Sequence, residues 1–347
     1  MHLKKVIITT EDRRSEIIIG GKWTEVAGYI PIERTVVITD ENIFRIYGEK
    51  FPSCQVFCIR PGEKSKNLDT IENLGSKLLS AGVDRGGFIL GIGGGVVCDI
   101  AGFLASVYMR GIRFGFVSSS LLSQVDASVG GKNGVNLGSV KNIFGTFNQP
   151  EFVICDTDML KTLPEDEYLS GLAELIKMGA ALSKSLLDSI EKNKEMIMAR
   201  ETKLMESLVY ESVRLKADIV SEDEKESGKR KILNFGHTFG HVIEAVTGQK
   251  HGLAIASGMK IAAVISVLEG MLQESESKHL IGLLGYFSLL KDHDISVEVY
   301  EKMIGTDKKR EGADVSFVLL EAEGKALIKK ISVKRLTGYI GLIEKIR

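Results

Sequence analysis

The sequence predicts two domains, an α/β domain with a parallel sheet followed by a domain made of helices. Three observations lead to this prediction. The 347 residues are about twice the length of a typical domain, and 44% of them are apolar, enough for a core in each half. All five prolines lie within the first 164 residues, so the second half is free of this helix breaker. Short β-branched segments alternate with helical patterns in the first half.

The elements follow from these patterns in chain order. In the first half, β-branched runs predict strands over residues 35–40, 54–60, 86–93, 113–120 and 152–158, and residues 67–82 form a helical pattern. Strands that alternate with helices build βαβ units, so we expect a Rossmann-like parallel sheet. In the second half, long periodic segments predict helices over residues 165–192, 194–222 and 238–268. We expect domains at residues 1–160 and 161–347, with the boundary close to Pro164.

Composition excludes several classes of partner. The net charge of −1 argues against nucleic acid and acidic membranes, so an anionic ligand must be met by individually placed cations. The start of the chain has only a four-residue apolar run, too short for a signal peptide. The longest apolar stretch is interrupted by Lys260 and falls short of the ~20 residues that span a bilayer. Four cysteines without a CxxC pair suit a reducing compartment, and we expect a cytoplasmic protein.

The glycine cluster in "GIGGGVVCDIAGFLAS" joins a predicted strand to a predicted helix. Glycines there let the backbone approach a pyrophosphate, which the N-terminus of the helix also favours. The cluster is not a GxGxxG fingerprint, because Val96 occupies the last glycine position, so a merely tight turn is the alternative. Asp40 and Asn42 end an earlier strand and "PGEKSK" ends the next. Polar groups at several strand ends favour a nucleotide site at one edge of the sheet.

The polar loop "SQVDASVGGKNGVNLGSVKN" gathers two lysines with amides and glycines. It is either a cradle for phosphate or carboxylate or a solvated surface loop. Arg110 adds a cation just upstream. Further on, Lys216 falls on the apolar stripe of a predicted helix, where its ammonium must either reach water or meet an anion. Glu226, Arg230 and Asn234 follow at spacings of four.

Three of the six histidines, His237, His241 and His251, fall within fifteen residues. Histidine nitrogens and a carboxylate are the usual ligands of catalytic Zn²⁺. "GHTFGH" lacks the glutamate of the HExxH motif, and core or capping histidines are the alternative. Glu174, in an apolar helix with Lys177 three residues on, is the nearest carboxylate candidate, unless the two form a simple surface pair.

Taken together, the motifs resemble the 3-dehydroquinate synthase family, a branch of the sugar phosphate cyclases. The resemblance rests on "GGGVVCDIAGF", "LLSQVDASVGGKNGVN", "KNIFGTFNQP", "LKTLPEDEYLSGLAELIKMG", "LNFGHTFGHVIEA" and "HGLAIASGM". It implies cyclisation of 3-deoxy-D-arabino-heptulosonate 7-phosphate to 3-dehydroquinate with loss of phosphate, through transient oxidation by NAD, elimination, reduction and aldol closure. It also implies a Zn²⁺ or Co²⁺ ion, a small sugar phosphate substrate and a homodimer.

The resemblance also implies roles for individual residues. The metal ligands would be Glu174, His237 and His251. The catalytic groups would be His241, Glu226, Lys132, Asp126 and Lys177. The substrate contacts would be Arg110, Asp126, Lys132, Asn142, Lys177, Lys216, Arg230, Asn234, His241 and Lys308, with Lys309 as the alternative to Lys308. The NAD contacts would be Asp40, Asn42, Glu63, Lys66, Gly94, Gly95, Val96, Asp99, Ser119, Ser120, Lys141, Lys161 and Thr162.

One departure from the family pattern lies beside a predicted metal ligand: Leu253 stands where the family commonly has glutamate. Residues near a ligand tune metal affinity, so this change bears on the metal site. The nearest alternatives are other sugar phosphate cyclases, whose substrates lack a carboxylate, and a metal-dependent polyol or glycerol phosphate dehydrogenase. A catalytically silent binding protein is the alternative from another class. Lys216 and Arg230 favour a substrate that carries a carboxylate.

Overall fold

The chain forms two compact units in a computed structural model that describes residues 3–10, 13–138, 140–305, 310–311 and 314–346. The first unit comprises Met1–Leu163 and Arg200–Lys225, and the second comprises Pro164–Ala199 and Glu226–Arg347. The domain bounds 1–160 and 161–347 stay a prediction, because units defined by contacts are not shown to fold independently.

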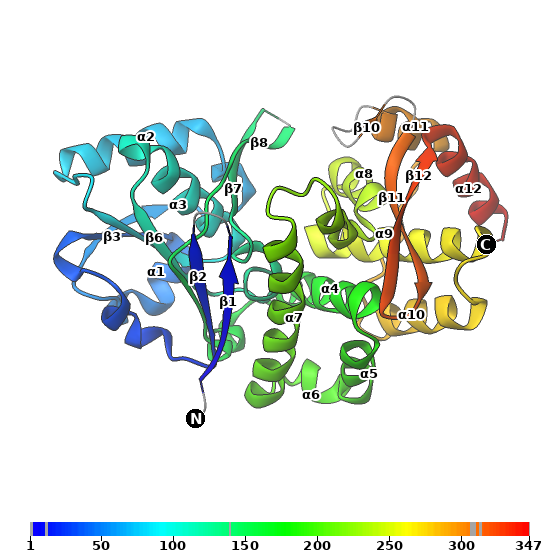
Figure 1. Cartoon of the computed structure of the whole chain (residues 1–347), viewed down its shortest axis with the longest axis horizontal. Coiled ribbons are helices and arrows are strands. Elements are labelled where there is room, and N and C mark those ends of the chain that lie inside the picture. Colours follow the sequence, from blue (N-terminus) through cyan, green and yellow to red (C-terminus); the bar gives the residue numbers. More distant parts are fainter. Residues whose placement is uncertain (1–2, 11–12, 139, 306–309, 312–313, 347) are drawn as a thin grey trace. The chain divides into compact units, whose positions relative to one another are not determined.

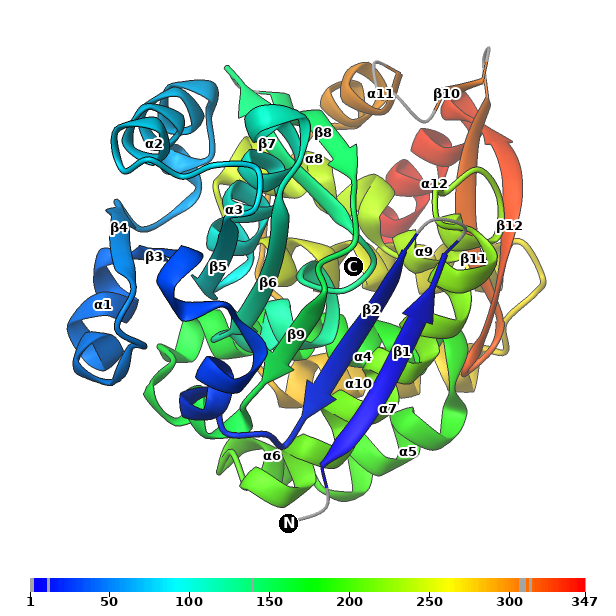
Figure 2. The ribbon, with the colours of Figure 1, turned by 60° about the vertical axis from the view of Figure 1, so that its left-hand side comes forward.

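The first unit is built on a mostly parallel sheet of seven strands. Their order is β1-β2-β9-β6-β5-β3-β4, and Figure 2 shows them side by side in this order. The strands are β1 (Lys4–Thr9), β2 (Arg14–Ile19), β3 (Thr35–Asp40), β4 (Gln55–Ile59), β5 (Phe88–Gly93), β6 (Arg113–Ser118) and β9 (Phe152–Cys155). Only the pair β1–β2 is antiparallel in this sheet. The prediction of a Rossmann-like parallel sheet is confirmed.

The order of the strands defines one position where ligands bind in such sheets. Strand β3 pairs with β4 on one side and with β5 on the other, in parallel registers Val36↔Gln55 and Thr39↔Ile92. The chain therefore leaves β3 in one direction and later returns on its other side, which makes a topological switch point. Asp40, the last residue of β3, lies at this point.

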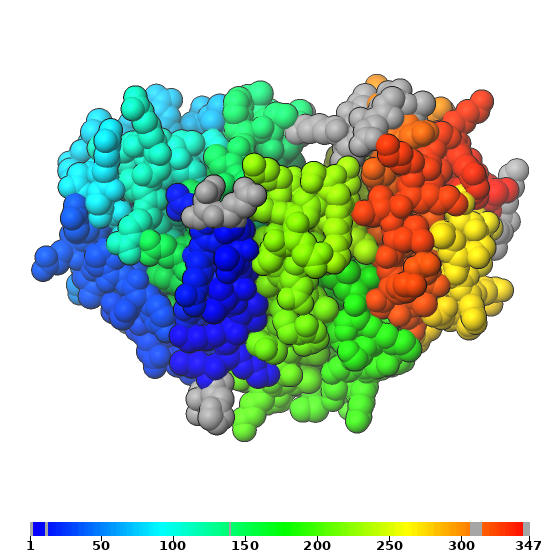
Figure 3. All heavy atoms as spheres, viewed as in Figure 1, coloured from blue at the N-terminus to red at the C-terminus, as the bar shows by residue number. Residues whose placement is uncertain are grey.

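Helices of the first unit surround the sheet. They are α1 (Glu41–Tyr47), α2 (Leu68–Ser80), α3 (Gly95–Val107) and α7 (Thr202–Glu222). Helix α3 contacts β5 and β6, whereas α7 contacts β1 and β2. Figure 3 shows the side chains of α7, in yellow-green, directly beside those of β1, in dark blue. Helix α7 comes from the proline-free half of the sequence, yet it packs on the sheet of the first unit.

A hairpin of two strands, β7 (Lys132–Leu137) and β8 (Val140–Phe147), forms a separate small sheet in the first unit. The sequence predicted a polar loop here, and the structure forms the hairpin from it. Four apolar side chains of β8 are exposed, between 40% and 47% each: Val140, Ile143, Phe144 and Phe147. Exposed apolar side chains on an edge strand are typical of a surface that another chain covers.

The second unit is mainly helical, as the sequence predicted. Its helices are α4 (Glu165–Leu182), α5 (Lys184–Lys192), α6 (Lys194–Met198), α8 (His237–Thr247), α9 (His251–Leu268), α10 (Glu274–Tyr286), α11 (Val297–Gly305) and α12 (Val333–Ile346). The long periodic segments are divided by local signals. Gly248, with φ of 69°, ends α8, and the side chain of Ser183 caps the start of α5.

The expectation of an all-α second domain omitted a sheet. Strands β10 (Arg310–Glu311), β11 (Asp314–Ala322) and β12 (Lys325–Ser332) form an antiparallel sheet. Strand β11 packs on α9 (Figure 1), and the Leu320 N–H donates to Ser266 Oγ at 3.0 Å. Strand β12 mixes lysines with apolar residues, so its alternation was too weak to predict a strand.

Helix α9 is long and apolar enough to cross a membrane by length and composition alone. It is, however, 72% buried inside the second unit, against α4, α8, α10 and β11. A helix that is apolar on nearly all sides belongs either in a membrane or in a core, and the protein surroundings account for α9.

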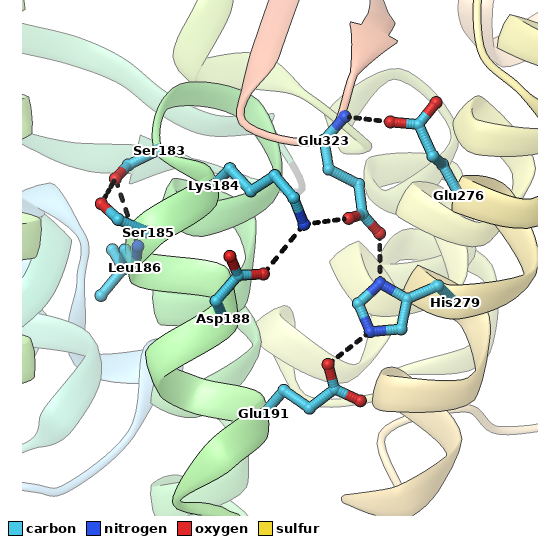
Figure 4. A network of polar contacts seen from close by, with 9 residues as sticks. All are labelled: Ser183, Lys184, Ser185, Leu186, Asp188, Glu191, Glu276, His279 and Glu323. Atoms are coloured by element: carbon cyan, nitrogen blue, oxygen red, sulfur yellow. Dashed lines mark hydrogen bonds and ion pairs between the residues drawn. The ribbon is translucent and has the colours of Figure 1, made fainter.

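A polar network ties three elements of the second unit together (Figure 4). His279 on α10 binds Glu323 through Nδ1 and Glu191 on α5 through Nε2, the latter at 2.7 Å. Glu323, in the turn between β11 and β12, also accepts from Lys184 Nζ at 2.9 Å. Its backbone N–H donates to Glu276 at 3.1 Å. The network therefore joins α5, α10 and the β11–β12 turn.

Candidate active site

Glu174, His237 and His251 come together in the second unit, from helices α4, α8 and α9. One ligand atom from each residue lies within 4.8 Å of the other two. Nε2 of His251 is 3.6 Å from Oε1 of Glu174, and the rings of His237 and His251 are 5.6 Å apart between centroids. The three residues proposed as metal ligands are thus neighbours, although 63 residues separate Glu174 from His237 along the chain.

The position of His251 follows from close contact between α4 and α9. The N–H of Gly252 donates to Ser170 Oγ at 2.9 Å. A Cβ on Gly252 would lie 2.0 Å from the carbonyl oxygen of Ser170, so only glycine allows this approach. Ser170 and Glu174 are one turn apart on the same face of α4. The contact at Gly252 therefore brings His251 next to Glu174.

The position of His237 follows from the turn before α8. Gly236 has φ of 80°, and a Cβ there would lie 2.8 Å from the backbone nitrogen of Met259 on α9. Glycine thus permits both the left-handed turn and the approach of the two helices. Nδ1 of His237 lies 3.2 Å from the carbonyl oxygen of Phe235. A ring that donates through Nδ1 keeps Nε2 available for a metal.

The charges within this cluster are strongly coupled. The side chain of Glu174 is fully buried and pairs with Lys177, whose side chain is 2% exposed. The alternative of a surface pair between these two residues is therefore wrong. Burial lowers the pKa of His251, but the neighbouring carboxylates of Glu174 and Glu244 outweigh this effect and raise the pKa to about 9. A metal ion that bound the predicted ligand His251 would then displace a proton.

The residues present fit a divalent transition metal. The buried carboxylate of Glu174 is paired with Lys177 at Oε2, whereas its Oε1 lies 3.6 Å from Nε2 of His251, a longer distance than a hydrogen bond. One carboxylate oxygen and two imidazole nitrogens suit Zn²⁺ or Co²⁺, and three protein ligands leave a position open for substrate. A second grouping, His241, Glu244 and His251, also has ligand atoms within 4.8 Å of one another and shares His251 with the first.

In the first unit, most of the residues predicted to contact NAD gather at the carboxyl edge of the sheet. Asp40 ends β3, and the predicted residues that follow the other strands are Glu63 and Lys66 after β4, Gly94, Gly95 and Val96 after β5, Ser119 and Ser120 after β6, and Lys161 and Thr162 after β9. Parallel strands place such residues at one edge, where open α/β sheets bind their ligands. Asn42 on α1 and Asp99 on α3 belong to helices that begin at this edge, whereas Lys141 is exposed on β8.

Helix α3 begins at this edge with its backbone N–H groups uncapped by any side chain. A Cβ on Gly95 would lie 3.2 Å from Cβ of Ala127, so the turn sits close against its neighbour. A thirteen-residue helix with a bare glycine start suits a pyrophosphate. The close approach at Gly95 also fits a merely tight turn, so the nucleotide interpretation of the glycine cluster stays a prediction.

Carboxylates at this edge are held by specific partners. Asp40 accepts from the N–H groups of Asn42 and Ile43 at 2.9 and 3.0 Å, which caps α1. Burial raises the pKa of the Asp40 carboxyl, and these two hydrogen bonds oppose the rise. Burial also raises the pKa of Asp99, against the effect of its ion pair with Lys66.

The β7–β8 hairpin is attached to the same edge. Asn136 donates to Glu63 at 2.8 Å and accepts from the N–H of Asn142 at 2.9 Å. The N–H of Asn136 also donates to the carbonyl oxygen of Lys66 at 2.9 Å. The hairpin therefore holds Asn142 within reach of groups predicted to contact NAD.

Lys216 meets an anion rather than water. Its side chain is 7% exposed and pairs with the carboxylate of Asp126, and Nζ donates to the carbonyl oxygen of Asp126 at 2.7 Å. Asp126 lies in a short π-helix, Ser123–Ala127, that packs on α7. Among the other predicted residues of the first unit, Lys132 is exposed at the start of β7, and Arg110 is exposed with φ of 68°.

Three of the remaining predicted residues of the second unit, Glu226, Arg230 and Asn234, lie before α8. Arg230 is only 2% exposed, and Nδ2 of Asn234 donates to Glu226 at 2.5 Å. The ring of His241, one turn after His237, lies 5.2 Å from the ring of His237 between centroids. Lys308 and Lys309 lie outside the described residues, so the choice between them stays a prediction.

The comparisons with known proteins agree with this geometry. The family description "3-dehydroquinate synthase N-terminal" matches residues 56–170, and "3-dehydroquinate synthase C-terminal" matches residues 171–310. The chain belongs to the 3-dehydroquinate synthase family. The resemblance that the sequence motifs indicated is confirmed. A family relative, the 3-dehydroquinate synthase of Dehalococcoides mccartyi strain CBDB1, is 39% identical, over 96% of this chain and 97% of the relative.

Two solved structures share the family's two-part architecture. A 2-deoxy-scyllo-inosose synthase, solved with carbaglucose-6-phosphate, NAD⁺ and Co²⁺, has a TM-score of 0.86 and 27% identity, covering 97% of this chain and 99% of its own. The 2-epi-5-epi-valiolone synthase from Streptomyces hygroscopicus subsp. jinggangensis 5008, with NAD⁺ and Zn²⁺ bound, has a TM-score of 0.89 at 20% identity. It covers 98% of this chain and 99% of its own, and at this identity the likeness shows the fold alone.

Sequence reasoning missed one residue of the metal cluster. Glu244 lies beside His251, with Oε2 at 3.2 Å from Nδ1. It follows His237 by seven residues, which places both on one face of α8. This i, i+7 spacing between His237 and Glu244 is the sequence signal that could have found Glu244.

Proposed function

We propose that this protein is a 3-dehydroquinate synthase of the cytoplasm. It converts 3-deoxy-D-arabino-heptulosonate 7-phosphate to 3-dehydroquinate and phosphate, with NAD and Zn²⁺ or Co²⁺. The observation that carries the proposal is Glu174: a fully buried carboxylate converges with two imidazoles, in a chain that belongs to this family. The ion pair with Lys177 accounts for the charge of Glu174, but it does not account for the two imidazoles that lie beside the carboxylate.

Two bound groups supply chemistry that side chains lack. When bound, NAD⁺ accepts and returns a hydride, and the divalent metal polarises substrate oxygens. Glu174, His237 and His251 would hold the metal. The NAD contacts would come from the residues at the carboxyl edge of the first unit's sheet, with the N-terminus of α3 facing the pyrophosphate.

The cations bind a substrate that carries both phosphate and carboxylate. Lys177 and Arg230 are buried, and a buried cation attracts an anion more strongly than an exposed one. Lys216 is paired with Asp126, and this ion pair partly offsets the positive charge of Lys216. The ion pair also fixes the position of the ammonium group that contacts the substrate. Lys132, Asn142 and Asn234 add polar contacts that fix orientation.

His241 and Glu226 move protons. His241 lies one turn from a metal ligand, close enough to act on substrate oxygens held there. The carboxylate of Glu226 accepts a hydrogen bond from Asn234, which holds it in place. Glu226 also has φ of 56°, a strained conformation of the kind that gathers at functional sites.

A phosphate-release assay tests the proposal. The purified protein, given the heptulosonate phosphate, NAD⁺ and Zn²⁺ or Co²⁺, should release phosphate and form dehydroquinate without accumulating NADH. Glucose 6-phosphate, which has no carboxylate, serves as the parallel substrate, because the solved relatives include a cyclase complexed with a sugar phosphate of that size. Cyclisation of glucose 6-phosphate alone would reassign the protein to the other cyclases, and stoichiometric NADH would reassign it to the dehydrogenases.

The proposal includes a homodimer. Four apolar side chains of β8 are exposed, and we propose that a second copy of the chain covers them: Val140, Ile143, Phe144 and Phe147. Analytical ultracentrifugation should find a dimer for the wild type and a monomer for Phe144→Glu with Phe147→Glu. A dimer that survives this double change would move the interface elsewhere.

A further inference from the structure

The two ring nitrogens of His251 face two different carboxylates. Nε2 is 3.6 Å from Oε1 of Glu174, and Nδ1 is 3.2 Å from Oε2 of Glu244. A metal held by Glu174 and His237 must therefore take Nε2 of His251. Nδ1 is left to Glu244, on the opposite edge of the ring.

His237 has the same division between its nitrogens. Its Nδ1 faces the carbonyl oxygen of Phe235 at 3.2 Å, which again leaves Nε2 for the metal. The acceptors differ in kind: a carbonyl is neutral, whereas a carboxylate is charged. A carboxylate on the far nitrogen of an imidazole fixes the tautomer and makes the ring a stronger donor.

Helix α8 and the turn that follows it place Glu244 beside His251. His237 is the first residue of α8, and Glu244 lies two turns later on the same face. The carbonyl oxygen of Glu244 accepts from the N–H of Gly248 at 3.0 Å, where the helix ends in a left-handed turn. His251 starts the next helix three residues later. One short turn thus returns the chain from Glu244 to its partner.

We propose that Glu244 is a positioning residue that accepts a hydrogen bond from Nδ1–H of His251 and thereby directs Nε2 toward the metal. This inference rests on the metal site of the proposed function and adds a residue to it. The side chain of Glu244 is 10% exposed, so little water competes for its carboxylate. Leu253, two residues beyond His251, has no polar atom with which to serve instead.

Metal affinity tests the proposal directly. Glu244→Gln and Glu244→Ala are compared with wild type by competition with a chelator for Co²⁺ and Zn²⁺, and by the visible spectrum of bound Co²⁺. The affinity should fall about 10-fold to 100-fold, more for alanine than for glutamine, whose amide oxygen still accepts. Glu274→Gln, an exposed residue paired with Lys278, is the matched control and should bind as wild type does.

Three outcomes would overturn the proposal. The first is wild-type affinity and an unchanged Co²⁺ spectrum in both variants. The second is that the wild-type protein binds two metal ions per chain, whereas the Glu244→Gln variant binds one ion with unaltered affinity. That result would make Glu244 a metal ligand together with His241. The third is an equal fall in both variants together with a lower melting temperature without metal, which is the behaviour of a purely structural residue. If the alanine variant does not fold, the isosteric glutamine variant decides.

The metal-affinity test of Glu244 and the phosphate-release test of the proposed function can fail independently of each other. A protein that fails to release phosphate but loses metal affinity on Glu244→Gln would remove the cyclase assignment and keep the positioning role. If the protein forms dehydroquinate but the Glu244 variants bind metal as the wild type does, the cyclase assignment stands and the positioning role of Glu244 is removed.

Discussion

Two histidines of the second unit are each held between two carboxylates, and they have different surroundings. His251 lies between Glu174 and Glu244, and His279 lies between Glu323 and Glu191 (Figure 4). The flanking carboxylates raise the pKa of both imidazoles against the effect of burial. By this local arrangement alone the two sites are equivalent.

The difference lies in the other contacts of the carboxylates. Glu323 has a second cation, Lys184, and its backbone is anchored to Glu276, so its charge is satisfied by the protein. Glu174 has Lys177 for an ion pair at Oε2, but its Oε1 lies 3.6 Å from Nε2 of His251, beyond hydrogen-bond distance, and a second imidazole lies beside it. A histidine between carboxylates therefore indicates a metal only where a buried oxygen is left unsatisfied and a third ligand is near.

The largest expected effect comes from removing each histidine in turn. His251→Ala removes a ligand and should lower metal affinity by more than the ~100-fold typical of residues beyond the ligands, with phosphate release falling in parallel. His279→Ala should keep one metal per chain and its activity. Metal content after dialysis and phosphate release measure both.

His237→Ala serves as a control for the comparison of His251→Ala with His279→Ala. His237→Ala should behave as His251→Ala does, since each is proposed to supply one nitrogen to the same metal. A His237→Ala protein that retains one metal per chain at native affinity contradicts the ligand set. Metal loss in His279→Ala would show that the two histidine sites are not distinct.

The next effect is the loss of stability on metal removal. A metal that binds only the folded protein stabilises it by about 2.7 kcal/mol at a free concentration 100 times its Kd. Chelation should therefore lower the urea midpoint of the wild type and of His279→Gln alike. It should leave His251→Ala unchanged, because that variant has little metal to lose. A chelator effect on His251→Ala equal to that on the wild type would contradict the assignment.

Much of the fold was predictable because its signals are local. The strands of the parallel sheet are continuous apolar runs, and the proline-free half formed helices. The β1–β2 pair, the β7–β8 hairpin and β12 were missed because charged residues, glycines and amides interrupt their apolar pattern. Strand β11 is an apolar run that was missed within the half predicted to be helical. Helix α7 was recognised as a helix, but its contact with β1 is a long-range property that no window of sequence contains.

The site was predictable to the extent that it lies in motifs. The ligand set came from the family resemblance, whereas the histidine cluster alone did not distinguish His241 from His237 and His251. The structure adds what pairs with each charge: Asp126 with Lys216, Lys66 with Asp99, and Glu244 with His251. The first two of these contacts join segments that are distant in the sequence. The contact of Glu244 with His251 is local, and the spacing of two helical turns between His237 and Glu244 could have revealed it.

A smaller effect is expected from the structural histidine. His279→Gln removes a charged partner from Glu323 and Glu191 and should lower the free energy of unfolding by about 1–2 kcal/mol at neutral pH. Glu274→Gln, on the same helix but exposed, should change it by less than about 0.5 kcal/mol. Urea unfolding followed by far-UV circular dichroism measures both. A loss no larger than that of the control would mean that Lys184 alone satisfies Glu323.

The smallest effect is the pH dependence of that loss. Burial lowers the pKa of His279, but its bonds to Glu323 and Glu191 outweigh this and raise the pKa above its usual value. A raised pKa means that the folded protein favours the protonated ring. The stabilisation is therefore complete below the unfolded pKa of about 6.5 and disappears as the pH rises through the folded pKa. The gap in urea midpoint between wild type and His279→Gln should narrow as the pH is raised above neutral. If the difference in urea midpoint instead widens, His279 acts as a neutral ring. The sites of His279 and His251 would then resemble each other in geometry but not in charge.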